Sequence, residues 1–169
     1  MIYALIVLAA LSRLLPHPPN FTPIAGMALF GAAMLPNKRL SLLLPLAALL
    51  LSDVFLGFYG WIGMLSVYGA TLLVGVLGYA LLRKKPGVQR IALAALSGSV
   101  LFFLVTNGVC WWTGYPHTFE GLSLCYTLAL PFFRNEVLGT LVSAIVLFGG
   151  QALLRRASEG RRRSVASPV

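Results

Sequence analysis

The sequence predicts an all-α fold, a polytopic integral membrane helix bundle of about six transmembrane helices. Of its 169 residues, 59% are hydrophobic and 10% are charged, which leaves too little polar surface to cover a water-soluble globule. Loops rich in Lys and Arg stay on the cytoplasmic side of a membrane, so separated basic clusters indicate a chain threaded back and forth. Long apolar runs separate three such clusters: Lys38 and Arg39; Arg83, Lys84, Lys85 and Arg90; and Arg155, Arg156, Arg161, Arg162 and Arg163.

The first two apolar segments, residues 1–15 and 21–35, are shorter than the roughly 20 helical residues that cross the hydrocarbon core. Pro16, Pro18 and Pro19 lie between them and prevent one continuous helix. The two segments form either two short tilted spans or a re-entrant pair. Both alternatives return the chain to the same side of the membrane, so the topology of the remainder is unchanged.

Four longer segments follow, each with the length of a membrane span: residues 40–58, 62–82, 91–112 and 134–154. With six spans and the basic clusters inside, we expect both termini to be cytoplasmic. Residues 1–154 are therefore predicted to form a single transmembrane helical domain, and residues 155–169 a basic cytoplasmic C-terminal tail.

A further apolar stretch, residues 121–133, is too short to span, and Pro131 separates it from the last span. We expect it to form one additional interfacial or re-entrant helix that covers the outer mouth of the bundle.

Under this topology the outer end of the bundle is aromatic and polar, whereas the inner loops contain no aromatic residue. A charge at the bilayer centre costs roughly 2.5–3.5 kcal/mol on insertion scales, so such residues face the bundle interior, pair, and often mark a ligand path. We therefore predict an outward-open substrate-binding pocket with aromatic walls. Its predicted residues are Arg13, Asp53, Asn107, Arg134, Asn135 and Glu136, with Tyr59, Trp111 and Trp112 as walls. The structural alternative is that Asp53 only pairs with Arg13 or Arg134 and holds helices together.

Other classes of function lack support in the sequence. The net charge of +9 lies in short flanks of apolar segments, so no nucleic-acid partner is predicted. Cys110, Cys125, His17 and His117 match no zinc spacing, so no metal and no cofactor is predicted. The two cysteines form either a disulfide or two free thiols. The sequence has no nucleophile triad, phosphate loop or HExxH motif, so we do not expect an enzyme.

Three segments carry a resemblance to a known family: SRLLPHPPNFTP at residues 12–23, LSDVFLGF at residues 51–58 and PFFRN at residues 131–135. They resemble an uncharacterised family of small bacterial integral membrane proteins labelled as transport proteins. The size, the six-segment plan and the outward pocket are more distantly similar to the S components of energy-coupling-factor (ECF) vitamin transporters. The resemblance implies a protein of the bacterial cytoplasmic (inner) membrane that takes up a small vitamin-like nutrient.

S components dock on a transmembrane coupling protein with ATPase subunits through small residues of the first helix. In this chain the best pair of small residues, Ala28 and Ala32, falls on the second segment, where it either packs inside the bundle or faces a partner membrane protein. The expected partners are thus a small-molecule substrate, the lipid bilayer and such a coupling protein. The alternative function is a non-transporting scaffold or assembly protein of the cell envelope.

Overall fold

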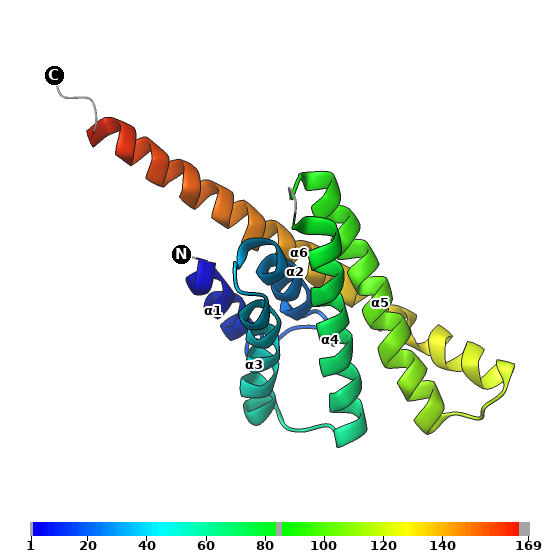
Figure 1. The fold of residues 1–169 in the computed structure, drawn as a ribbon. Coiled ribbons are helices and arrows are strands. Elements are labelled where there is room, and N and C mark those ends of the chain that lie inside the picture. Colours follow the sequence, from blue (N-terminus) through cyan, green and yellow to red (C-terminus); the bar gives the residue numbers. More distant parts are fainter. Residues whose placement is uncertain (1, 84–85, 166–169) are drawn as a thin grey trace.

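The computed structural model describes residues 2–83 and 86–165, with side chains to residue 161. This part of the chain forms helices and no strand, which confirms the all-α prediction (Figure 1). The six helices are α1 (Ile2–Ser12), α2 (Ile24–Met34), α3 (Lys38–Leu56), α4 (Trp61–Leu82), α5 (Val88–Gly114) and α6 (Phe119–Val165). Lys84 and Lys85 of the second basic cluster, and residues 166–169 of the predicted tail, lie outside the described residues.

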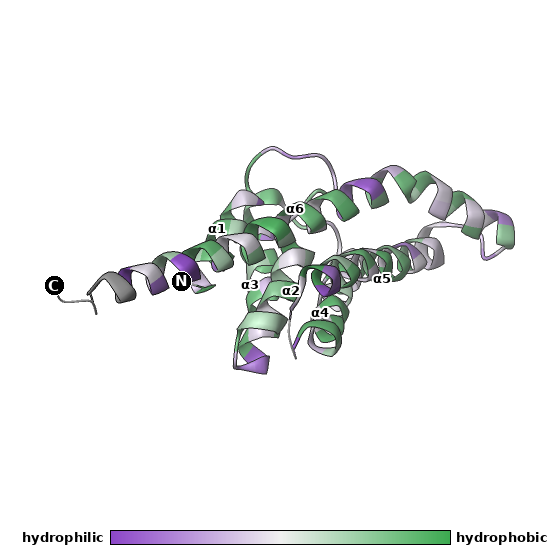
Figure 2. Cartoon of the chain, turned by 90° about the horizontal axis from the view of Figure 1, so that it is seen from above, coloured by the Kyte–Doolittle hydropathy of each residue, from purple (hydrophilic) through white to green (hydrophobic). Residues whose placement is uncertain are grey.

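Four helices, α3 to α6, are long and apolar enough to cross a membrane. Their outward surfaces are also apolar: Leu51, Leu65 and Ile145 expose 65%, 63% and 71% of their areas. Figure 2 shows mainly hydrophobic residues along these helices, with hydrophilic residues toward helix ends and part-way along α6. A helix that is apolar all round suits lipid rather than water, so the fold is that of a membrane protein.

Helices α1 and α2 have 11 residues each and are therefore only about 16 Å long, too short to cross the membrane alone. Helix α2 forms the centre of the bundle and packs against all the other helices. Its Met27, Leu29 and Phe30 are completely buried. A helix too short to span is tolerated at membrane depth when protein surrounds its ends.

The small residues of α2 pack inside the protein. Ala28 and Ala32 are only 1% and 2% exposed. Gly78 of α4 lies so close to α2 that a Cβ atom there would stand 2.9 Å from the Ala32 side chain. The interpretation of Ala28 and Ala32 as a face for a partner protein is therefore wrong, because close packing between α2 and α4 already uses that face.

Helices α3, α4 and α5 run alternately up and down in Figure 1. The turn between α3 and α4, which contains Tyr59, lies at one end of α4, and Arg83 lies at the other end. The basic residue Arg83 and the aromatic residue Tyr59 thus lie at opposite ends of the bundle, as the sequence predicts.

The structure differs from expectation at Pro131, where α6 continues without a break. Contacts with α5 on both sides of the proline hold the helix together. Tyr126 donates a 2.8 Å hydrogen bond to the carbonyl oxygen of Leu104, and the Phe103 ring packs on Phe133 at a centroid distance of 4.6 Å. A proline removes one helical hydrogen bond and tends to kink the helix, but these contacts offset that cost. The predicted interfacial segment is helical, yet it is the first part of α6.

Helix α6 has 47 residues and is about 70 Å long, more than twice the thickness of the hydrocarbon core. It crosses the whole bundle obliquely in Figure 1, and its ends extend beyond the other helices. Its last turns include residues 155–165, so most of the predicted tail is a continuation of this helix.

Candidate functional site

A buried ion pair joins the end of α1 to α3. Nη1 of Arg13 lies 2.8 Å from Oδ1 of Asp53, whose side chain is only 1% exposed. Tyr68 of α4 donates a 2.9 Å hydrogen bond to the other carboxylate oxygen, Oδ2. Arg13 also donates to the Leu49 carbonyl oxygen at 3.2 Å and to Ser52 Oγ. Both oxygens of Asp53 are thus engaged, and the network holds α1, α3 and α4 together.

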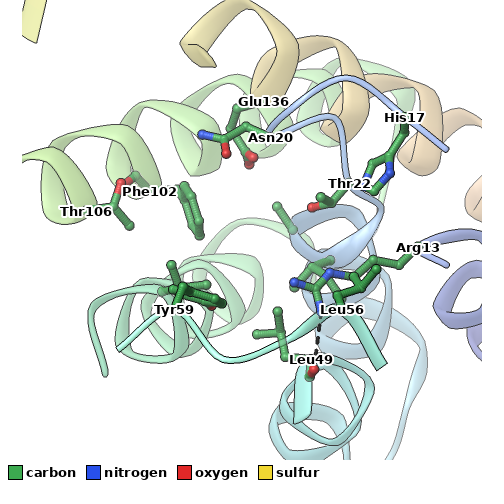
Figure 3. Close-up of a pocket in the computed structure, with 13 residues that line it drawn as sticks. Arg13, His17, Asn20, Thr22, Leu49, Leu56, Tyr59, Phe102, Thr106 and Glu136 are labelled. Carbon is green, nitrogen blue, oxygen red and sulfur yellow. Dashed lines mark hydrogen bonds between the residues drawn. The ribbon is translucent and has the colours of Figure 1, made fainter. Parts of the chain in front are cut away.

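A cavity of about 410 Å³ lies beside this network. Figure 3 shows side chains from the α1–α2 connection and from several helices projecting toward the open space. The cavity is lined by Arg13, His17, Asn20, Thr22, Ile24, Ala25, Leu49, Leu56, Tyr59, Val67, Phe102, Thr106 and Glu136. Its volume is within the range of small-molecule sites, and apolar walls with a few polar groups are typical of them.

The connection between α1 and α2 brings three polar side chains to the cavity. Asn20 has a φ of 63°, in the left-handed region that asparagine tolerates better than most residues. The segment then packs on α6 at Gly139, where a Cβ atom would stand 2.8 Å from the Thr22 nitrogen. The turn and this close approach place His17, Asn20 and Thr22 at the cavity wall.

Glu136 supplies the acidic group of the cavity. Its side chain is almost completely buried, and the residue is 4% exposed. Oε1 accepts a 3.1 Å hydrogen bond from the hydroxyl of Thr140, one turn further along α6. No Lys, Arg or His among the described residues lies within ion-pair distance of this carboxyl group.

Tyr59 lies in the turn between α3 and α4 and forms part of the cavity wall. Tyr59 is 47% exposed, and the partial desolvation of its phenol, with a smaller contribution from the negative charge of Asp53, raises its pKa to about 12. The phenol therefore stays protonated at neutral pH and can donate a hydrogen bond to a ligand.

Four of the polar residues predicted for the pocket do not line the cavity: Asp53, which lies behind Arg13 in the buried ion pair, and Asn107, Arg134 and Asn135. Arg134 is exposed and has no acidic partner in the described part of the chain, so Asp53 pairs with Arg13 instead. Asn135 donates a 2.9 Å hydrogen bond to the Pro19 carbonyl oxygen and so supports the α1–α2 connection. Asn107 donates at 2.8 Å to the carbonyl oxygen of Phe103 in its own helix.

The two tryptophans predicted as walls also lie elsewhere. Trp111 donates a 3.1 Å hydrogen bond to the Pro116 carbonyl oxygen, and Trp112 stacks on His117 with a centroid distance of 4.5 Å. Both belong to the last turn of α5, about 8–9 Å along the helix from Thr106, which does line the cavity. The aromatic walls of the cavity are instead Tyr59 and Phe102.

Sequence reasoning missed several residues of the site. Thr140 was recognisable, because it lies four residues after Glu136 on the same helix face. His17, Asn20 and Thr22 belong to the SRLLPHPPNFTP segment that carries the family resemblance. The role of Tyr68 as a hydrogen-bond donor to Asp53 could not be predicted from the sequence, since it depends on how α4 packs on α3.

Cys110 and Cys125 are free thiols in the structure, Cys110 exposed and Cys125 buried. Cys125 donates from Sγ to the Asn107 carbonyl oxygen at 3.6 Å. Within the described ranges, no three His, Cys, Asp or Glu side chains are grouped so that they could hold a metal ion.

Residues 1–163 match a family of unknown function, DUF6580, and the chain belongs to this family. No curated protein and no solved structure matches it. The likeness to ECF S components remains a prediction from the sequence.

Proposed function

We propose that this member of the DUF6580 family binds a small solute in the cavity beside Arg13 and carries it across the membrane, as S components do for vitamin-like nutrients. The observation that supports this proposal is the 410 Å³ cavity itself, with Arg13 and Glu136 in its wall. Ionisable residues inside a membrane bundle are costly and usually belong to substrate or ion pathways. Residues that only packed helices together would need no cavity.

The proposed location is the bacterial cytoplasmic (inner) membrane, with both termini in the cytoplasm. Lys38, Arg39 and Arg83 support this orientation, because they lie at the end of the bundle opposite to Tyr59. The cavity then opens toward the outside. A transmembrane coupling protein with ATPase subunits remains the proposed partner, but it cannot dock on the buried face of Ala28 and Ala32.

Mass spectrometry of small molecules that survive gentle detergent purification tests the proposal. A copurifying vitamin-like molecule, or a thermal shift by one member of a panel of vitamins and their precursors, is the expected result. Anything that binds only the folded state raises the apparent melting temperature by mass action.

Two matched variants on α5 show whether binding occurs in the cavity. Thr106→Phe places a ring in the cavity and should remove the ligand, whereas Thr113→Phe, at an exposed position of the same helix, should retain it. If wild type carries no ligand and no compound shifts its melting temperature, the non-transporting envelope scaffold becomes the better explanation.

A further inference from the structure

Glu136 is the acidic side chain of the cavity wall that lacks a counter-charge. Its only hydrogen bond in the described structure comes from the neutral hydroxyl of Thr140, at 3.1 Å. It is more than nine-tenths buried and lines the cavity. Figure 3 shows it on a different side of the open space from Arg13.

The charge of Arg13 does not compensate for Glu136. Asp53 lies 2.8 Å from the guanidinium group, so these two charges neutralise each other. The N-terminus of α2 also borders the cavity through Ile24 and Ala25, but a helix terminus carries only about half an elementary charge. His17 also lies in the cavity wall, but its ring contacts the Leu15 carbonyl oxygen through Nδ1 and lies beyond ion-pair distance of Glu136. An ionised Glu136 carboxylate therefore has no ion-pair partner among the described residues, and burial makes that arrangement strongly unfavourable.

The rest of the wall suits a cation. The faces of aromatic rings attract cations, and Tyr59 and Phe102 both line the cavity. Asn20, Thr22 and Thr106 add neutral oxygen atoms, which can accept hydrogen bonds from an ammonium group.

We propose that the solute carries a protonated amine, which forms an ion pair with the Glu136 carboxylate inside the cavity. This inference rests on the proposed function, because it names the chemistry of the solute bound at the same site. The ligand supplies a positive charge to a carboxylate that has no ion-pair partner among the described residues, so Glu136 becomes a selectivity element.

Three probes that share an indole ring and differ in the terminal group test the inference on the purified full chain. Tryptamine carries an amine, tryptophol a hydroxyl and indole-3-acetate a carboxylate. We expect tryptamine to bind about thirty-fold or more tightly than the other two by calorimetry, because a buried charge pair of this kind is strongly coupled.

The variant Glu136→Gln keeps the shape of the side chain and the oxygen that accepts from Thr140, and it should abolish the preference for tryptamine. Glu120→Gln is the matched control, since Glu120 is an exposed carboxylate at the start of the same helix and should leave the preference unchanged. The comparison of the three probes on wild type holds even if Glu136→Gln fails to fold.

Equal affinity of the three probes, including equal absence of binding, overturns the amine inference. Preference for tryptamine that persists in Glu136→Gln overturns it as well. The proposed function is judged separately, by the copurifying molecule: a ligand without an ionisable amine would support solute binding and refute the role of Glu136.

Discussion

Replacing Asp53 with Ala should destabilise the protein by about 4 kcal/mol. Removal of one partner from a buried ion pair costs about 3–5 kcal/mol, because the remaining charge is buried without compensation. Arg13 would be left in that state, with its side chain only 11% exposed. It keeps Leu49 and Ser52 as hydrogen-bond partners, which favours the lower half of this range. Tyr68 loses its acceptor, which adds about 1 kcal/mol.

A double-mutant cycle isolates the pair from these other effects. Arg13→Met removes the second charge, so the double variant Arg13→Met/Asp53→Ala should recover about 3 kcal/mol relative to the sum of the single variants. The free energy of unfolding is measured in mixed micelles with increasing dodecyl sulfate, followed by circular dichroism. Glu120→Ala serves as the control for loss of an exposed carboxylate and should change stability by no more than about 0.5 kcal/mol.

Additive effects of the two single variants would refute this reasoning. A coupling energy below about 0.5 kcal/mol means that the two charges do not stabilise one another. The pair would then not be the connection between α1 and α3 that the structure shows, and the assignment of Arg13 to the cavity wall would fail with it.

Three further predictions address individual residues. Arg134→Ala should change the free energy of unfolding by less than about 0.5 kcal/mol, because Arg134 is exposed; a larger loss in the same assay would place it in the buried network. Gly139→Ala should cost about 1–3 kcal/mol, since its Cβ atom would stand 2.8 Å from the Thr22 nitrogen, whereas Gly149→Ala, with open space around it, should cost nothing. In an alkaline titration followed by tyrosinate absorbance, Tyr59→Phe should remove a component that titrates near pH 12 rather than pH 10. Because the pKa of Tyr59 is higher in the folded than in the unfolded state, its contribution to stability should be lost as the pH rises from 10 to 12. If the component removed by Tyr59→Phe titrates near pH 10, the phenol is not desolvated beside Asp53.

Part of the site could be predicted from the sequence alone. Arg13, Asp53 and Glu136 stand out because a charge within an apolar segment is costly and therefore buried in the protein interior. Their partners could not be predicted from the sequence. Asp53 could pair with Arg13 or Arg134, and nothing in the spacing of residues distinguishes the two. The pairing depends on which sides of α1, α3 and α6 meet.

Trp111 and Trp112 illustrate the same limit. Their sequence positions place them at the aromatic end of the bundle, and they are there. Whether they face the cavity depends on their position along α5, and contacts with Pro116 and His117 hold them against the α5–α6 turn instead.

The sequence by itself determined the class of the protein and the position of most helices, because apolar length and the placement of basic residues are local properties. Only the tertiary structure decided that α2 is the buried centre, that α6 continues through Pro131, and that Arg13 and Glu136 share one cavity. Those features arise from contacts between segments far apart in the chain. A helix that is apolar all round gives no pattern from which the face in contact with its neighbours can be read.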